Sequence, residues 1–268
     1  MTSAKATRRK RREAQAAPPP VKAPGQRRQA SPKVLIGAGV LVLLIVVAIV
    51  LGFVLTGGKS SSGSTPARGS LVNALPSATE VNTLLKGIPQ SGNVLGSPNA
   101  PVTLAEYIDL QCPACQAFET QAMPQLIQRY VRTGKVKVEA RPIAFIGPDS
   151  QTGRNAALAA AKQNRFFNFS QLLYFNQGVE NTGWLDDTMI KAAAASIPGL
   201  DVPRLLSDRS SSTVSDQAKA FDAQSDQDNV TETPTVLVGK SGGPLRKVSF
   251  PSLSDPTAIE AAIQAAQR

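Results

Sequence analysis

The sequence predicts an α/β domain that carries an inserted helical subdomain and is preceded by a single N-terminal transmembrane helix. Three observations lead to this fold class. An uncharged run of 23 residues covers 34–56, which is long enough to cross a bilayer as a helix. A strand–helix–strand pattern covers 102–143 and holds the only two cysteines at its first turn. Strand character returns at 233–250, after a long helical region.

Residues 1–33 precede the apolar run and are rich in Lys, Arg, Ala and Pro, so we expect a disordered tail. This tail holds ten of the 29 basic residues, and the positive-inside rule keeps such a tail in the cytoplasm. A cleaved signal peptide is the alternative, but its apolar segment is usually about 7–15 residues long and ends at a small-residue cleavage site. We therefore favour a retained, single-pass anchor in the cell membrane over 34–56, with the remaining domain extracytoplasmic.

Composition excludes several classes of function. Beyond the tail, 19 basic and 18 acidic residues nearly balance, so we expect no nucleic-acid partner. The sequence contains no histidine, which excludes histidine-based catalysis and histidine-containing metal sites. Two cysteines cannot complete a four-cysteine zinc site within one chain. We expect no metal and no bound cofactor, and we identify no dimerisation segment, so a monomer is expected.

A Gly/Ser-rich stretch over 57–78 is expected to be a flexible linker between the anchor and the folded domain. That domain is expected to cover 79–268. Its first half consists of a short amphipathic helix at 77–87, a short edge strand at 93–96, a buried strand at 102–109, a helix at 113–130 and a second strand at 135–143.

The second half begins with a helical region, about 149–226, that is too long for one crossover helix and is therefore interpreted as an inserted subdomain. Two strands at 233–239 and 245–250 then form a hairpin, and a final helix covers 255–267. The insert is rich in aromatic residues: Phe166, Phe167, Phe169, Tyr174 and Phe175. We expect these side chains to pack the insert onto the sheet; lining a substrate groove is the alternative.

The tetrapeptide Cys112-Pro113-Ala114-Cys115 lies where the first buried strand gives way to a helix. Unpaired N–H groups and the helix dipole favour an anion there, so Cys112 is expected to have a lowered pKa and to be the attacking thiolate. Cys115 lies one turn further on and is expected to be the buried, resolving thiol. Pro113 and Ala114 are expected to tune the pair. A structural disulfide and half of an intermolecular metal site are the alternatives, but so small a loop removes little entropy from the unfolded chain.

Glu106 interrupts an apolar strand six residues before Cys112. A carboxyl group buried beneath the pair would have a raised pKa and could relay the proton of Cys115. A partly exposed charge at the strand end is the alternative. Asp109 and Gln111 flank the site and are interpreted as ordinary polar turn residues.

Pro234 stands at the start of a later strand, directly after Thr233. Proline is tolerated at the first residue of a strand and on edge strands, which is enough to explain a proline at this position. Because only about 5–6% of X-Pro bonds in folded proteins are cis, the spacing alone does not predict a cis bond.

These motifs together resemble the DsbA-like thiol oxidoreductases of the thioredoxin fold. The resemblance rests on Ala100-Pro101-Val102-Thr103-Leu104, Glu106, the Cys-Pro-Ala-Cys tetrapeptide with Phe118 behind it, and Thr233-Pro234-Thr235-Val236-Leu237-Val238-Gly239. It covers roughly residues 79–268. It implies a thioredoxin-like fold whose two halves are separated by the family's helical domain.

The resemblance also implies a role for each site residue. Cys112 would be the nucleophile, Cys115 the resolving thiol and Glu106 the buried acid. Thr233-Pro234 would be cis and packed against the disulfide, with the Thr233 backbone binding an extended substrate. The family's usual activity is to oxidise thiols of secreted proteins, which here means reduced or misoxidised extracytoplasmic polypeptides, with reoxidation by a quinone-linked membrane partner.

Ala114 departs from the pattern of the strongly oxidising members, which carry histidine before the second cysteine. A methyl group cannot donate to the Cys112 thiolate, so we expect a less lowered pKa and a less oxidising pair than in a histidine-bearing site. Two other functions therefore stay open beside oxidation of thiols. One is a reductase or isomerase of extracytoplasmic disulfides, and the other is an anchored peptide-binding module with a structural disulfide.

Overall fold

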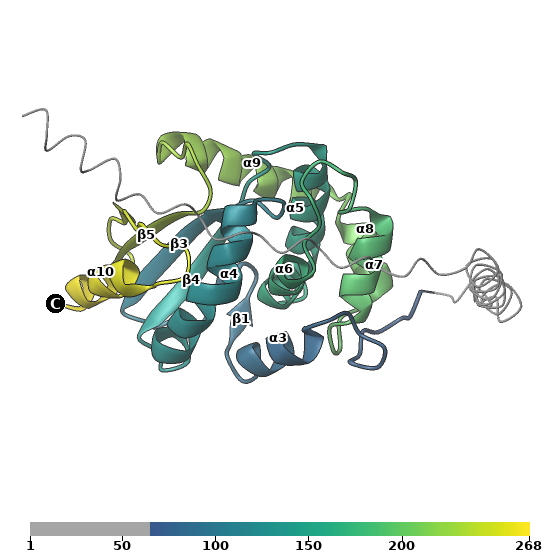
Figure 1. Cartoon of the computed structure of the whole chain (residues 1–268), viewed down its shortest axis with the longest axis horizontal. Helices are drawn as coiled ribbons and strands as arrows, with labels where there is room; N and C mark the ends of the chain where they lie inside the picture. The colour runs from purple at the N-terminus through teal and green to yellow at the C-terminus, as the bar shows by residue number, and fades with distance from the viewer. Residues whose placement is uncertain (1–64) are drawn as a thin grey trace, which may run out of the picture. The chain divides into compact units, whose positions relative to one another are not determined.

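A six-stranded mixed sheet forms the centre of residues 65–268, which are the part of the chain that the computed structural model describes (Figure 1). Its strands are β1 (Gln90–Ser91), β2 (Val94–Leu95), β3 (Val102–Ile108), β4 (Val136–Pro142), β5 (Thr235–Lys240) and β6 (Arg246–Val248). They lie in the order β1-β2-β4-β3-β5-β6, with β3 and β4 parallel and the other neighbours antiparallel. The predicted strand–helix–strand unit and the later hairpin are both confirmed.

All seven residues of β3 are buried, because elements pack on both faces of the sheet at this strand. Neighbouring side chains along a strand point to opposite faces. Glu106 therefore faces the side of the sheet that α4 (Pro113–Leu126) covers, and Tyr107 faces the other side. There the Tyr107 hydroxyl donates to Asp228 Oδ2 at 2.6 Å, and Arg141 donates to both groups. These bonds tie the end of α9 (Ser212–Gln227), and the loop that leads to Thr233, to the sheet.

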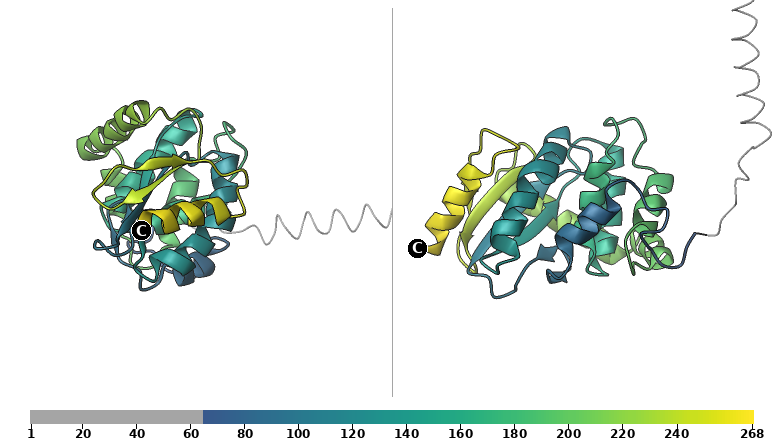
Figure 2. Two further views of the ribbon diagram at one scale, coloured as in Figure 1. Left: turned by 90° about the vertical axis from the view of Figure 1, so that its left-hand side faces the viewer. Right: turned by 60° about the horizontal axis from the view of Figure 1, so that its bottom comes forward.

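The helix α4 continues through Pro124 into a π-helical turn, Ile127–Val131, and the chain reverses at Gly134, whose φ is 74°. The last helix, α10 (Thr257–Gln267), covers the same face of the sheet as α4 (Figure 2). An ion pair of 2.6 Å joins Arg129 to Glu260 between them. At the start of α10, Asp255 Oδ1 accepts from the Thr257 N–H at 3.0 Å.

The region between β4 and β5 is helical, as predicted. It consists of α5 (Pro148–Ala161), α6 (Phe166–Phe175), α7 (Asp187–Ala195), α8 (Val202–Asp208) and α9. Four of the five aromatic residues of α6 are buried, and α6 packs against α4, α5 and α3 (Ala78–Leu85). These aromatics are therefore mostly core residues, as predicted, but α6 packs mainly on neighbouring helices and not on the sheet, as had been expected. Phe175 is the exception and remains partly exposed.

The structure differs from the prediction in the position of one strand and in the start of the folded domain. The segment at 93–96 is not an edge strand, because β1 pairs with β2 on its outer side. Part of the predicted linker is bound to the insert, since the Gly69 N–H donates to Leu200 O at 2.9 Å and the Ser70 N–H to Ala195 O at 2.8 Å. An added Cβ at Gly69 would lie 2.2 Å from the Ile197 oxygen, so only glycine permits this approach. Residues 67–70 thus belong to the folded domain, and 57–64 lie outside the described residues.

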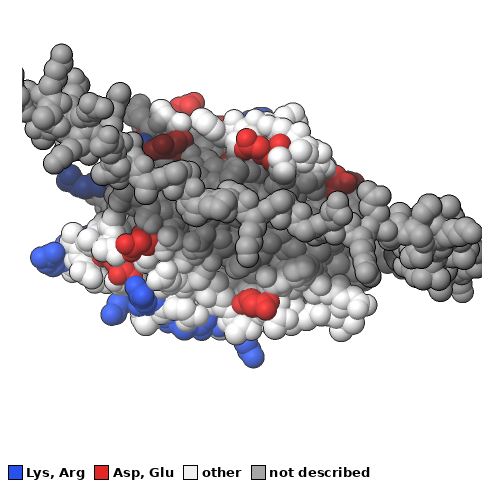
Figure 3. All heavy atoms as spheres, viewed as in Figure 1, with Lys and Arg blue, Asp and Glu red and all other residues white. Residues whose placement is uncertain are grey.

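The predicted tail (1–33) and anchor (34–56) also lie outside the described residues. Within 65–268, no helix is both long enough and apolar enough to cross a membrane. On the face seen in Figure 3, many of the visible Lys and Arg side chains gather along the left and lower edges. The end that carries α10 and β5 lies on the left in the same view (Figure 1).

Candidate active site

The two cysteines lie at the N-terminus of α4, directly after the turn that ends β3. Cys112 is the N-cap residue, Pro113 occupies the first turn, and the Cys115 N–H points back to Cys112 Sγ at 3.4 Å. Proline suits this place because the N–H that it lacks would have no partner inside the helix. The local sequence thus leads the helix N–H groups onto one sulfur atom, as the sequence predicts.

The environment of Cys112 favours its thiolate. The hydrogen bond from the Cys115 thiol is the largest influence and lowers the pKa of Cys112 to about 6, although burial opposes this shift. Thr233 and the backbone N–H groups of Cys115 and Ala114 lower the pKa further. Cys112 is 8% exposed, so its sulfur is recessed but accessible to a thiol that enters the site.

Cys115 has the opposite properties. It is fully buried, and burial raises the pKa of its thiol well above the usual range, with the neighbouring Cys112 adding to the shift. A buried thiol of this kind reacts only with a partner that is already next to it. Cys115 is therefore placed to displace a group bound to Cys112, and not to meet an external substrate first.

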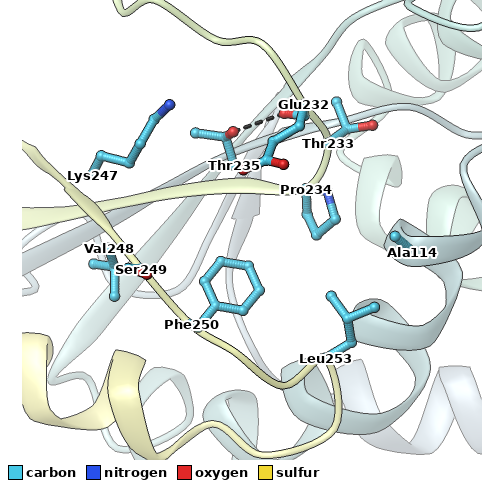
Figure 4. Close-up of a pocket in the computed structure, with 10 residues that line it drawn as sticks. All are labelled: Ala114, Glu232, Thr233, Pro234, Thr235, Lys247, Val248, Ser249, Phe250 and Leu253. Carbon is cyan, nitrogen blue, oxygen red and sulfur yellow. Dashed lines mark hydrogen bonds between the residues drawn. The ribbon is translucent and has the colours of Figure 1, made fainter.

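The segment before β5 closes the site from the other side. The Thr233–Pro234 peptide bond is cis, as the resemblance implies, and Cys112 Sγ lies 3.3 Å from the Thr233 carbonyl oxygen. A cavity of about 400 Å³ opens beside Pro234 and Ala114. In Figure 4, the side chains of Phe250 and Leu253 face Pro234 across this cavity. An extended polypeptide can therefore approach Cys112 along an apolar wall.

A pair of buried carboxyl groups lies on the α4 side of the sheet, where the sequence predicts one. Glu106 is 1% exposed, and burial followed by the proximity of Glu119 raises its pKa well above the usual range. Burial also raises the pKa of Glu119, whose Oε2 accepts a hydrogen bond from Gln171 at 2.5 Å. Like charges in a dry site oppose each other, so a charge on Glu119 makes Glu106 harder to ionise.

Tyr174 is a buried tyrosine that bonds to the turn before Cys112. The tyrosine is fully buried and donates to the Asp109 carbonyl oxygen at 3.1 Å. Burial raises its pKa, and the charges of Cys115, Glu119, Glu106 and Asp109 raise it further. No hydrogen bond joins Glu106 directly to either cysteine among the described residues, so a proton passing between them needs an intermediate group such as water.

Asp109 and Gln111 are not the ordinary turn residues that the sequence suggests. Both are fully buried. The Asp109 carboxylate accepts the N–H groups of Gln111, Phe145 and Ile146 at 2.7–2.9 Å. The Gln111 side chain bonds to Ser150 and accepts the Asn181 N–H at 2.8 Å. These two residues hold the turn before Cys112 against the insert.

Sequence reasoning missed Glu119, although one signal was available. Residues four apart lie on the same face of a helix, so Glu119 had to share the face of Cys115. A carboxyl group on that face is buried whenever its helix packs on a sheet. Gln177 was also missed; its side-chain amide donates to the Leu110 and Cys112 carbonyl oxygens at 3.0 and 3.4 Å.

The reactivity of Cys112 is expected to follow its lowered pKa. In reduced protein, the rate of modification by iodoacetamide should reach half of its plateau near pH 6, because only the thiolate reacts. Cys115→Ala removes the donor that lowers the pKa most, so this midpoint should move toward about 8.5. Mass spectrometry of quenched samples measures both curves, and a wild-type midpoint near 8.5 would contradict the assignment.

An easily ionised thiol next to a buried thiol that can displace it is what thiol–disulfide exchange requires. The protein is a thiol–disulfide oxidoreductase. Residues 90–243, more than half of the chain, match the family model described as Thioredoxin, and the chain belongs to that family.

Similar proteins agree with this class. The chain is 29% identical over 162 residues to a Bacillus cereus protein named "Probable disulfide bond formation protein D". The aligned region covers 59% of this chain and 74% of that protein. The fold of the present chain is similar to the crystal structure of oxidised BdbD from Bacillus subtilis, with a TM-score of 0.57 and 22% identity. The match covers 67% of this chain and 96% of the other. Wolbachia pipientis alpha-DsbA1 gives a TM-score of 0.55 at 20% identity over 70% and 98% of the two chains. The predicted thioredoxin-like fold of the DsbA type is confirmed.

Proposed function

We propose that the protein oxidises thiols of secreted or membrane polypeptides outside the cytoplasm, using the Cys112–Cys115 pair. The observation that carries this proposal is the contrast between the two thiols. An environment that stabilises the Cys112 thiolate stabilises the reduced form of the pair, which makes the disulfide a stronger oxidant. The names of the Bacillus relatives, disulfide bond formation proteins, support the same direction.

The proposed reaction takes two exchanges. A substrate thiolate attacks Cys112 Sγ, the bond to Cys115 breaks, and Cys115 leaves with the electron pair and takes up a proton. A second substrate thiolate then attacks the substrate sulfur of the mixed disulfide, and Cys112 leaves as a stabilised thiolate. Two electrons pass from the substrate to the enzyme. An oxidant must remove them before the next cycle, and we propose a quinone-linked membrane protein for this step.

The proposed location rests on the sequence of the N-terminal part. The uncharged run at 34–56 follows a tail with ten basic residues, and that order favours a cytoplasmic N-terminus and an extracytoplasmic domain. Disulfides form and persist outside the cytoplasm, so an oxidase is useful there. We propose a single-pass, membrane-anchored monomer.

A reductase or isomerase is the second candidate, and Ala114 is the observation that favours it. The methyl group of Ala114 stands at the rim of the substrate cavity and donates no hydrogen bond to Cys112. A pair stabilised only by Cys115, Thr233 and backbone N–H groups has a smaller bias toward the thiolate than one with an added cationic donor.

The redox state of the pair in intact cells separates the two candidates. Cells that make the protein are quenched with acid, and free thiols are then labelled with a reagent that adds mass. The oxidase predicts that most molecules carry the Cys112–Cys115 disulfide, whereas a mostly reduced pair would show the reductase. Labelled Cys115→Ser protein gives the mass expected for a molecule with one free thiol. A thiol label that does not cross membranes tests the extracytoplasmic location.

A further inference from the structure

Two cavities lie along the hairpin of β5 and β6, and they share two residues. The first is the cavity of about 400 Å³ beside Pro234, described above. The second has a volume of about 570 Å³ and lies further along β5, toward the end of α10. Lys247 and Val248 of β6 line both. The two cavities are therefore adjacent, and the second lies further from Cys112 along the same hairpin.

Small side chains explain why the second cavity is open. Its lining includes Val238, Gly239, Pro244 and Val248 of the hairpin and Ala262, Ala265 and Ala266 of α10. Methyl groups are too short to fill the space between a helix and the sheet that it covers. A volume of this size is in the range of about 300–1,000 Å³ that is typical of ligand sites.

Three cationic residues line this cavity: Lys240, Arg246 and Lys247. The side chains of Lys240 and Arg246 share the face of Val238, which α10 covers, whereas the Lys247 side chain points to the opposite face. None of its lining residues is acidic. Among residues 65–268, no carboxylate lies within ion-pair distance of the three. The one side-chain hydrogen bond of these residues within 65–268 is from Lys247 Nζ to the Asn229 carbonyl oxygen, at 3.3 Å. An apolar space with unpaired cations at its rim suits an apolar side chain that is next to a carboxylate.

The outer edge of β6 favours a polypeptide as the occupant. β6 is the last strand of the sheet among the described residues, so its outer N–H and C=O groups have no strand partner. Such an edge can accept an extended segment as an added strand. From Pro234 to Lys240 the chain advances six residues, which corresponds to about 20 Å at the usual rise of a strand. An extended substrate bound at Cys112 therefore reaches the cations four to six residues from its cysteine.

We infer that the second cavity is a substrate subsite that selects an apolar residue next to an acidic residue, four to six positions from the reacting cysteine. This inference rests on the proposed function and names a feature of its substrates. Selection arises because a carboxylate gains attraction to Lys240 and Arg246, whereas its amide isostere gains none. The pairing of charges also makes the preference sensitive to salt.

Peptides of matched sequence test the subsite. The full chain in detergent is oxidised and mixed with a reduced two-cysteine peptide that carries Leu-Asp five residues beyond its second cysteine, or Leu-Asn in its place. We expect kcat/KM for loss of peptide thiols to be about threefold to tenfold higher for Leu-Asp at low salt, and the ratio to fall toward one at 1 M salt. In a Lys240→Glu/Arg246→Glu double variant the preference should invert. Lys191→Glu, at an exposed cation of α7 in the helical insert, should keep the wild-type ratio.

A second measurement separates failure of the subsite from failure of the proposed function. Cysteine-free copies of the peptides, labelled with a fluorophore, report binding by anisotropy without any redox step. Equal oxidation and equal binding of the two peptides would overturn the subsite while the oxidase stands. Preferential binding of Leu-Asp without oxidation would keep the subsite and overturn the oxidase. The third outcome is that the full chain binds vesicles of anionic lipid, loses this binding in the double variant and shows no peptide preference. That result would show a lipid as the occupant of the cavity and overturn the inference.

Discussion

Cys115→Ser is expected to hold the enzyme in a covalent complex with its substrate. The reduced variant keeps the accessible Cys112 thiolate, which attacks a disulfide in an oxidised polypeptide. Without the Cys115 thiol, nothing inside the site displaces the bound sulfur. A mixed disulfide that joins Cys112 to a substrate cysteine should therefore accumulate and be visible by mass spectrometry of the alkylated, non-reduced complex.

Cys112→Ser is the matched control and is expected to form no such complex. Its remaining thiol is fully buried and has a raised pKa, so it meets no external disulfide. Oxidation of a reduced polypeptide should fall by more than about 10³-fold, toward the rate without enzyme. A peptide-binding module with a structural disulfide would behave differently, because it forms no covalent intermediate and its binding would survive both substitutions.

Glu106→Gln is expected to slow the exchange steps in which Cys115 gains or loses a proton. General acid–base assistance typically contributes about 10²–10⁴-fold, and we expect the smaller figure here because no direct bond joins Glu106 to Cys115. The loss should appear in the rate at which Cys115 resolves a mixed disulfide. Alkylation of Cys112 should keep its wild-type pH midpoint, since Glu106 is not among the groups that shift it. Quenched-flow thiol counting measures the first quantity and iodoacetamide labelling the second.

The same substitution should change stability in a pH-dependent direction. Burial raises the pKa of Glu106 in the folded state, so the folded protein binds more protons than the unfolded chain and loses stability as pH rises above about 4.5. Glutamine cannot ionise, and the variant should gain about 1–3 kcal/mol over wild type at pH 8 but little at pH 4.

Glu119→Gln distinguishes the two acids of the pair. It removes the neighbour that helps to raise the pKa of Glu106, so the pH dependence of resolution should move to lower pH while the plateau rate is kept. Denaturant unfolding and the resolution assay, each at several pH values, test both variants. An unchanged resolution rate in Glu106→Gln at every pH would exclude a role for this carboxyl group in proton transfer.

Local sequence signals predicted much of the fold and the centre of the site. The helix N-terminus at Cys112 and the burial of β3 follow from patterns that act over a few residues. The cis bond before Pro234 did not follow from spacing, because a proline at a strand edge has the same sequence signature in either isomer. It followed only from the resemblance.

The features that were missed depend on contacts between distant segments. Glu119 becomes an acidic partner only because α4 packs over β3, and Asp109 becomes buried only because the loop at 145–146 closes over it. The docking of Gly69 onto the insert likewise depends on the Ile197 carbonyl group, 128 positions away in the sequence. In a Gly/Ser-rich stretch, such a contact leaves no local pattern.

The most direct test of the account is the transfer of one disulfide between enzyme and substrate. Oxidised full chain is mixed with one equivalent of a reduced, unfolded two-cysteine polypeptide, and acid-quenched samples are analysed for thiols on each partner. The account predicts that two thiols appear on Cys112 and Cys115 as two disappear from the polypeptide, through a transient mixed disulfide on Cys112 alone. Retention of both polypeptide thiols, or a mixed disulfide on Cys115, would contradict it.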